Sequence, residues 1–117
     1  MSEKVLVLDD EKICCHFLKG CLEEEGFSVK TALRGDEALQ IADDFLPDVL
    51  ISDWMLKDIY SGVDVARLMA EKNPKLRIIF ITGMAAEALV ERAAEVPPFD
   101  VLEKPVDIDE LLGLLRK

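Results

Sequence analysis

The sequence has no long hydrophobic run. After its first four residues it enters a short apolar segment that Asp9 and Asp10 interrupt, and the longest later apolar stretch, residues 78–81, has only the length of a strand. Such runs are too short for a secretory signal or a membrane-spanning helix. We therefore expect a cytoplasmic protein with no membrane insertion.

Basic residues are also few. The chain has 14 Lys and Arg against 24 Asp and Glu, which gives a formal net charge of −10. A nucleic-acid backbone demands a basic face, so this balance argues against nucleic acid as a direct partner and against anionic membranes. Cations, or proteins with a basic surface, suit the chain better.

Cysteine is scarce, and its placement excludes two roles. The three cysteines are Cys14, Cys15 and Cys21. In a helix Cys14 and Cys21 would lie about 10 Å apart along the axis, which is too far for a disulfide. His16 has no second Cys or His pair with which to complete a zinc site. We expect buried or half-buried thiols that serve packing.

Repeats, low-complexity tracts and Gly/Ser linkers are absent, and 117 residues fit one domain, 1–117. Short apolar runs instead alternate with longer amphipathic segments. The near-continuous Val, Ile, Leu and Phe content of the short runs predicts strands buried on both faces. These predicted strands are residues 4–8, 27–31, 48–52, 77–81 and 99–103.

The amphipathic segments have helical spacing. In the first, Ile13, Phe17 and Cys21 form an apolar stripe, with Leu18 and Leu22 as weaker members. The others are a stripe of Ala38, Ile41, Ala42 and Phe45, the segments 62–72 and 85–95, and a final helix capped by Asp107 in a capping-box arrangement with Glu110. Five strands alternating with five helices predict an α/β fold with a doubly wound parallel sheet.

Ligand chemistry in such sheets gathers at the carboxyl ends of the strands. These ends place Asp9, Asp10 and Glu11 after the first strand, Asp53 after the third, Thr82 after the fourth and Lys104 after the fifth. Adjacent carboxylates repel unless a cation lies between them, and hard oxygen ligands suit Mg²⁺. An ammonium and a hydroxyl beside such a metal favour phosphoryl transfer to a carboxylate.

With these residues the chain resembles the receiver domain of response regulators in two-component systems, whose minimal single-domain form is the chemotaxis regulator. The motifs are Leu-Asp-Asp-Glu at 8–11, Ile-Ser-Asp at 51–53, Ile-Thr-Gly at 81–83 and Glu-Lys-Pro at 103–105. The resemblance covers essentially the whole chain. It implies a flavodoxin-like (βα)5 fold with strand order 2-1-3-4-5.

The resemblance also implies the roles of individual residues. Asp53 would accept a phosphoryl group from a phosphohistidine on a sensor histidine kinase or phosphotransfer protein, with Thr82 and Lys104 on the phosphoryl oxygens. Mg²⁺ would be ligated by Asp9 or Asp10, principally Asp10, together with Asp53 and the backbone carbonyl of Met55. The Lys104–Pro105 bond would be cis. Such a domain is a signalling switch that assists only its own phosphorylation and dephosphorylation, and is not otherwise an enzyme.

The chain departs from the family pattern at two points. Lys57 stands where the loop after Asp53 usually has proline, in a loop about one residue longer than the common form. Val101 stands at a position that is commonly aromatic, with Phe99 earlier on the same strand face. The phosphorylation chemistry is therefore expected to be intact and the output mechanism altered.

Two other functions stay open. One is a receiver fold that docks partners without phosphate, and the other is a Mg²⁺-dependent phosphohydrolase, although Asp53 lacks an acid two residues further on. For the switch we expect output by contact with a downstream protein, unless the chain is a receiver from a longer regulator or hybrid kinase. A homodimer is compatible with the sequence.

Overall fold

The computed structural model describes residues 3–54, 56, 61–83 and 98–116. Five parallel strands form one sheet in the order β2-β1-β3-β4-β5, which confirms the predicted fold class and strand order. The elements are β1 (Lys4–Leu8), α1 (Lys12–Glu24), β2 (Ser28–Ala32), α2 (Gly35–Phe45), β3 (Val49–Asp53), α3 (Gly62–Lys72), β4 (Arg77–Thr82), β5 (Phe99–Glu103) and α5 (Ile108–Leu115).

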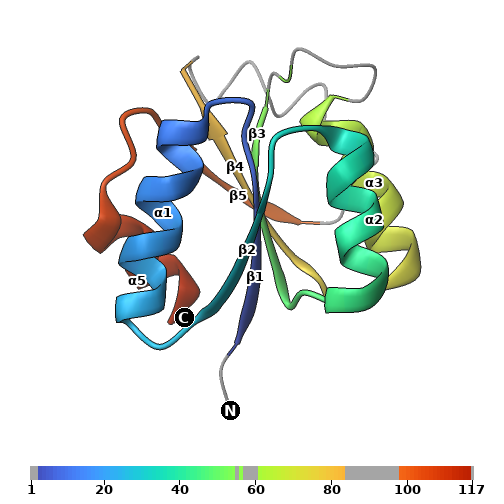
Figure 1. Ribbon diagram of the computed structural model, residues 1–117, viewed down its shortest axis with the longest axis horizontal. Coiled ribbons are helices and arrows are strands. Elements are labelled where there is room, and N and C mark those ends of the chain that lie inside the picture. The colour runs from blue at the N-terminus through green and yellow to red at the C-terminus, as the bar shows by residue number, and fades with distance from the viewer. Residues whose placement is uncertain (1–2, 55, 57–60, 84–97, 117) are drawn as a thin grey trace.

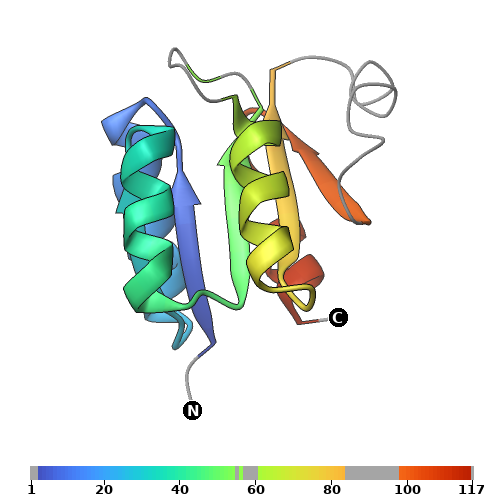
Figure 2. The ribbon, with the colours of Figure 1, turned by 90° about the vertical axis from the view of Figure 1, so that its right-hand side faces the viewer.

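Helices cover both faces of the sheet. In Figure 1, α1 and α5 lie on one side of the sheet and α2 and α3 on the other, and Figure 2 shows α2 and α3 in front of the strands. Because side chains alternate along a strand, β1 sends Val5 and Val7 into the core under α1 and α5, and Leu6 and Leu8 into the core under α2 and α3. The carboxyl ends of the strands therefore meet at one edge of a rigid sheet.

Two strands are displaced by one residue from their predicted bounds. β2 begins at Ser28 because Ser28 pairs with Lys4, and the parallel register then runs to Ala32 opposite Leu8. β3 runs through Asp53, which pairs with Ile81 of β4. The predicted acceptor is thus the last residue of a buried strand. The helix predicted over 85–95 lies outside the described residues.

The predicted apolar stripe of α1 was wrong for Ile13 and Phe17, and only its weaker members, Leu18 and Leu22, are fully buried. Ile13 is 85% exposed and Phe17 50% exposed, whereas Cys15, Leu18 and Leu22 form the buried face. Both sets have helical spacing, and the sheet packs against the second. The first leaves two large apolar side chains in solvent near the start of the helix.

Side chains cap the starts of α3 and α5, whereas α1 and α2 begin without a side-chain cap. The Asp107 carboxylate accepts hydrogen bonds from the backbone N–H groups of Asp109 and Glu110, and Ser61 and Asp64 form a reciprocal capping box at α3. Leu111, Leu112 and Leu115 form the buried face of α5. Within the described residues, every helix is too short or too polar to cross a bilayer.

Candidate functional site

The carboxyl edge of the sheet brings together three predicted carboxylates. Asp9 and Asp10 directly follow β1, and Asp53 ends the neighbouring β3. One oxygen from each of the three lies within 4.8 Å of the other two. Asp9 and Asp53 are buried, so their mutual repulsion is poorly screened by water.

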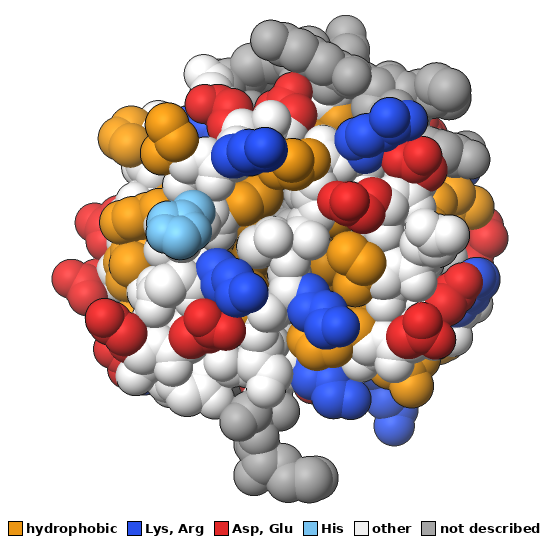
Figure 3. Space-filling view, in the orientation of Figure 1, with side chains coloured by type: hydrophobic (Ala, Val, Ile, Leu, Met, Phe, Trp, Pro, Cys, Tyr) orange, Lys and Arg blue, Asp and Glu red, His pale blue; other side chains and the backbone are white. Residues whose placement is uncertain are grey.

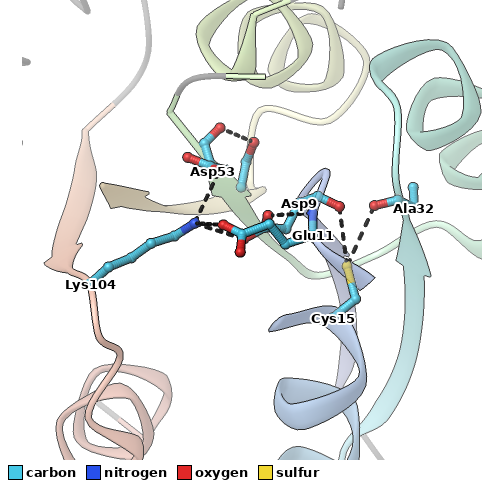
Figure 4. A network of polar contacts seen from close by, with 7 residues as sticks. Asp9, Glu11, Cys15, Ala32, Asp53 and Lys104 are labelled. Atoms are coloured by element: carbon cyan, nitrogen blue, oxygen red, sulfur yellow. Dashed lines mark hydrogen bonds and ion pairs between the residues drawn. The ribbon is translucent and has the colours of Figure 1, made fainter. Parts of the chain in front are cut away.

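Lys104 reaches this cluster from the end of β5. Its Nζ lies 3.1 Å from Oδ2 of Asp53, 3.2 Å from Oδ2 of Asp9 and 3.3 Å from Oε1 of Glu11. Figure 4 shows the ammonium extended between these carboxylates. The predicted convergence of Asp9, Asp10, Asp53 and Lys104 at one edge is therefore present.

The electrostatics of Lys104 follow from this position. Burial lowers the pKa of its ammonium, but the carboxylates of Asp53 and Asp9 outweigh burial and hold the pKa above its ordinary value. Lys104 is therefore positively charged across the physiological range. One ammonium still leaves the surrounding carboxylates with excess negative charge.

The donor set fits a divalent cation. Oδ1 of Asp9 accepts a hydrogen bond from the backbone N–H of Glu11 at 2.9 Å. Oδ2 of Asp9 is buried and accepts no hydrogen bond of good geometry from the described residues, and its ion-pair partner is Lys104. A buried oxygen of this kind, close to two further carboxylates, suits a hard cation such as Mg²⁺.

Backbone contacts fix the ends of the strands relative to one another. The N–H of Trp54 donates to the carbonyl of Ile81 at 2.9 Å, and the N–H of Lys104 donates to the carbonyl of Thr82 at 2.7 Å. Thr82 is buried at the end of β4, one residue beyond the partner of Asp53. Asp53, Thr82 and Lys104 thus lie at the ends of three neighbouring strands, β3, β4 and β5, which these backbone hydrogen bonds hold together.

Gly62 allows α3 to begin close to Asp53. A Cβ at this position would collide with the carbonyl oxygen of Asp53 and lie 3.0 Å from Oγ of Ser52. The N–H of Gly62 donates to the carbonyl of Trp54 at 3.3 Å. Close backbone approach, rather than an unusual φ angle, explains the glycine here.

Trp54, which directly follows Asp53, is buried in the core. It is 6% exposed, and its ring meets Phe80 edge-on with centroids 5.2 Å apart. Phe80 in turn contacts Phe99 of β5 at 5.1 Å. Val101 packs partly buried against the same core. An aromatic contact series therefore runs from the residue after Asp53 to β5, and at β5 its aromatic member is Phe99.

The cysteines are free thiols, as predicted. Cys15 is buried, and its Sγ contacts the carbonyl oxygens of Asp9 and Ala32 at 3.4 and 3.7 Å. Burial, followed by the nearby Asp9, raises the pKa of Cys14 to about 12 and that of Cys15 to about 11. Both thiols stay protonated at neutral pH. The contacts of Cys15 hold the start of α1 against the ends of β1 and β2.

Glu11 contacts Lys104 in the site. The sequence placed Glu11 after the first strand but assigned it no role in the site. Only its position after Asp9 and Asp10 could have indicated it. The Lys104–Pro105 bond is cis, as the resemblance implied. Two further positions, Met55 with its proposed ligating carbonyl and Lys57, lie outside the described residues.

Comparisons with known proteins agree with this geometry. The family model of the response regulator receiver domain matches residues 5–116. The phosphate regulon transcriptional regulatory protein PhoB of Rhizobium meliloti is 36% identical over 99% of the chain, which spans 52% of PhoB.

Solved structures of response regulators are also similar to this chain. The chemotaxis protein CheY4 of Vibrio cholerae superposes with a TM-score of 0.91 at 25% identity, covering 99% of this chain and 98% of CheY4. The receiver domain of the Francisella response regulator 1452 gives 0.85 at 30% identity, covering 98% and 94% of the two chains. Fold, edge geometry and family match coincide: the chain belongs to the response regulator receiver domains of two-component signalling.

Proposed function

We propose that this receiver domain is a phosphorylation switch whose acceptor is Asp53. The observation that supports it is the contact between Lys104 Nζ and Oδ2 of Asp53 at 3.1 Å, beside a cluster of three carboxylate oxygens within 4.8 Å. A carboxylate so placed has a cation on one side and a cation-binding pocket on the other. Phosphoryl transfer to a carboxylate uses both the ammonium and the bound cation, because each offsets negative charge on the phosphoryl oxygens.

The donor in this proposal is a phosphohistidine on a sensor histidine kinase or phosphotransfer protein. An oxygen of Asp53 attacks the phosphorus, an O–P bond forms, and the P–N bond breaks with its electron pair returning to the donor imidazole. The product is an acyl phosphate on Asp53. Since Asp53 is the last residue of a strand paired on both sides, its backbone is held in a fixed position at the edge, which favours an ordered approach of the donor.

Asp9, Asp10 and Asp53 would hold Mg²⁺, with the Met55 carbonyl as a further ligand by family resemblance. The bound ion would supply positive charge to the equatorial phosphoryl oxygens during transfer. Lys104 would donate to a phosphoryl oxygen from the other side, and the buried hydroxyl of Thr82 would donate to another. These contacts would differ between the free and phosphorylated states and so bias two conformations.

A route for the output also lies in this region. Trp54 and Phe80 connect the acceptor to Phe99 on β5 through edge-to-face ring contacts. Phe99 would thus take over part of the role that an aromatic residue at the Val101 position has elsewhere in the family. The downstream target in this proposal is a protein that recognises the surface around β5.

The phosphodonor partner would approach over the start of α1. Ile13 and Phe17 are exposed there, within about two turns of Glu11 at the edge, and they line a surface hollow of about 720 Å³ together with Lys12, His16 and Lys19. Figure 3 shows the single histidine among hydrophobic side chains on this side of the molecule. Exposed apolar side chains grouped with basic ones favour a partner with an apolar, acidic surface.

Incubation with acetyl phosphate and Mg²⁺, followed by intact-protein mass spectrometry, tests the proposal. We expect a gain of one phosphoryl group that chelation of Mg²⁺ prevents and that Asp53→Asn abolishes. The same samples titrated with beryllofluoride should change the fluorescence of Trp54, which is the only tryptophan. No adduct under any of these conditions would favour a receiver fold that docks partners without phosphate.

A further inference from the structure

Glu11 makes two different contacts at the edge. Its backbone N–H holds Oδ1 of Asp9 at 2.9 Å, and its carboxylate lies 3.3 Å from Nζ of Lys104. The side chain of Glu11 is 67% exposed, whereas that of Asp9 is fully buried and that of Asp53 is 11% exposed. Lys104 therefore has two buried carboxylate partners and one in solvent, and Figure 4 shows how the three lie around its ammonium.

The two buried partners also belong to the cluster of carboxylates where a divalent cation would bind. Oδ2 of Asp9 lies 3.2 Å from Nζ of Lys104, and Oδ2 of Asp53 lies 3.1 Å from the same ammonium. An ammonium and a divalent cation on the same carboxylates would repel each other strongly at this depth. Lys104 would therefore be displaced from Asp9 when that carboxylate ligates a metal ion.

Glu11 is positioned to receive the displaced ammonium. We propose that Glu11 is a positioning residue that holds Lys104 when Asp9 ligates a divalent cation, and that it thereby raises the affinity of the site for Mg²⁺. The inference rests on the proposed Mg²⁺ site. The Glu11–Lys104 ion pair would contribute more in the metal-bound protein than in the metal-free protein. Without metal, Glu11 is one of three carboxylates around Lys104, and with metal bound at Asp9 it would be a principal partner of the ammonium.

The Mg²⁺ dissociation constant, measured by calorimetry and by Trp54 fluorescence, tests this role. Glu11→Gln keeps the size of the side chain and the N–H bond to Asp9 and removes only the charge that faces Lys104. Glu24→Gln removes the same charge from an exposed position at the far end of α1 and is the matched control. Both substitutions are also made in a Lys104→Met background.

With Lys104 present, Glu11→Gln should weaken Mg²⁺ binding by about fivefold, since an exposed ion pair contributes up to roughly that factor. Glu24→Gln should change it by less than about twofold because its charge is distant and screened. In the Lys104→Met background the effect of Glu11→Gln should fall to about twofold or less, which is the direct attraction of its charge for the metal. Thermal unfolding of the metal-free Glu11→Gln protein should match that of the control.

Two results would overturn the role of Glu11: an affinity within twofold of the control, or an equal loss with and without Lys104. The second would mean that Glu11 acts through its own charge alone. Failure of the proposed function is distinguishable, because it would appear in the unsubstituted protein as an absence of Mg²⁺ binding. In that case the positioning role fails with it.

Discussion

The two edges of the sheet use charge in opposite ways. At the edge where the strands begin, cations have separate partners: Arg116 pairs with Glu25 at 2.7 Å, and the guanidinium of Arg77 donates to the carbonyls of Leu114 and Leu115 at the end of α5. At the edge where the strands end, one ammonium is shared by three carboxylates. In the first arrangement each cation has its own partner and fastens the end of α5 to another element.

The second arrangement is unbalanced, and the imbalance lies in the interior. Asp9 is 0% and Asp53 8% exposed, so their negative charge is costly to bury without further cations. A fold tolerates such a cost where function requires it. The cations with separate partners therefore have a structural role, whereas the buried excess of negative charge indicates a functional site.

Removal of a carboxylate should therefore have very different effects at the two edges. Asp10→Ala should slow phosphoryl uptake from acetyl phosphate at fixed Mg²⁺ by about 100-fold, because a ligand of the charge-neutralising ion is lost. Asp48→Ala, at the opposite edge, removes a carboxylate that accepts from the N–H of Lys4 at 2.9 Å and should leave the rate unchanged. Initial rates of mass gain measure both, and equal rates for the two variants would contradict the comparison.

An exposed apolar side chain lies near each edge, and we expect only the one beside the site, Phe17, to contact the phosphodonor. Phe17→Glu should slow transfer from a phosphorylated protein donor by about tenfold, the loss of one good interface contact, and should leave uptake from acetyl phosphate unaffected. Leu46→Glu changes a side chain that is 66% exposed near the opposite edge and is the control. If both variants slow the protein donor alike, or if Phe17→Glu also slows the small donor, the donor does not approach over α1.

Arg77→Met should have the smallest effect on phosphorylation and a clear one on stability. Loss of two charge-assisted hydrogen bonds to the end of α5 should lower the free energy of unfolding by about 2 kcal/mol. Chemical denaturation measures that loss, and uptake per folded molecule should not change. Slower phosphoryl uptake with unchanged stability would show that the edge where the strands begin also contributes to phosphorylation.

Much of the fold was predictable because its pattern is local. Runs such as residues 5–8 and 78–81 are apolar throughout, which indicates strands buried on both faces, and Asp107 marks the start of α5. The topology rule for parallel sheets then brings Asp53 and Lys104 to one edge, although they are far apart in the chain.

What the sequence did not predict depends on packing between elements. Ile13 and Phe17 have the same helical spacing as Leu18 and Leu22, and only the position of the sheet decides which face is buried. Trp54 follows a strand directly, but its burial depends on Phe80 from the next strand. The sharing of Lys104 with Glu11 likewise depends on side-chain geometry across the edge.

Locating the phosphoryl group on the chain tests the central claim most directly. After treatment with acetyl phosphate and Mg²⁺, borohydride reduction converts an aspartyl phosphate to homoserine, and peptide mass spectrometry identifies the modified position. Homoserine should be found at residue 53 alone, and none should form when Mg²⁺ is chelated. Homoserine at position 9 or 10, or at none, would contradict the assignment of Asp53 as the oxygen between a metal ion and Lys104.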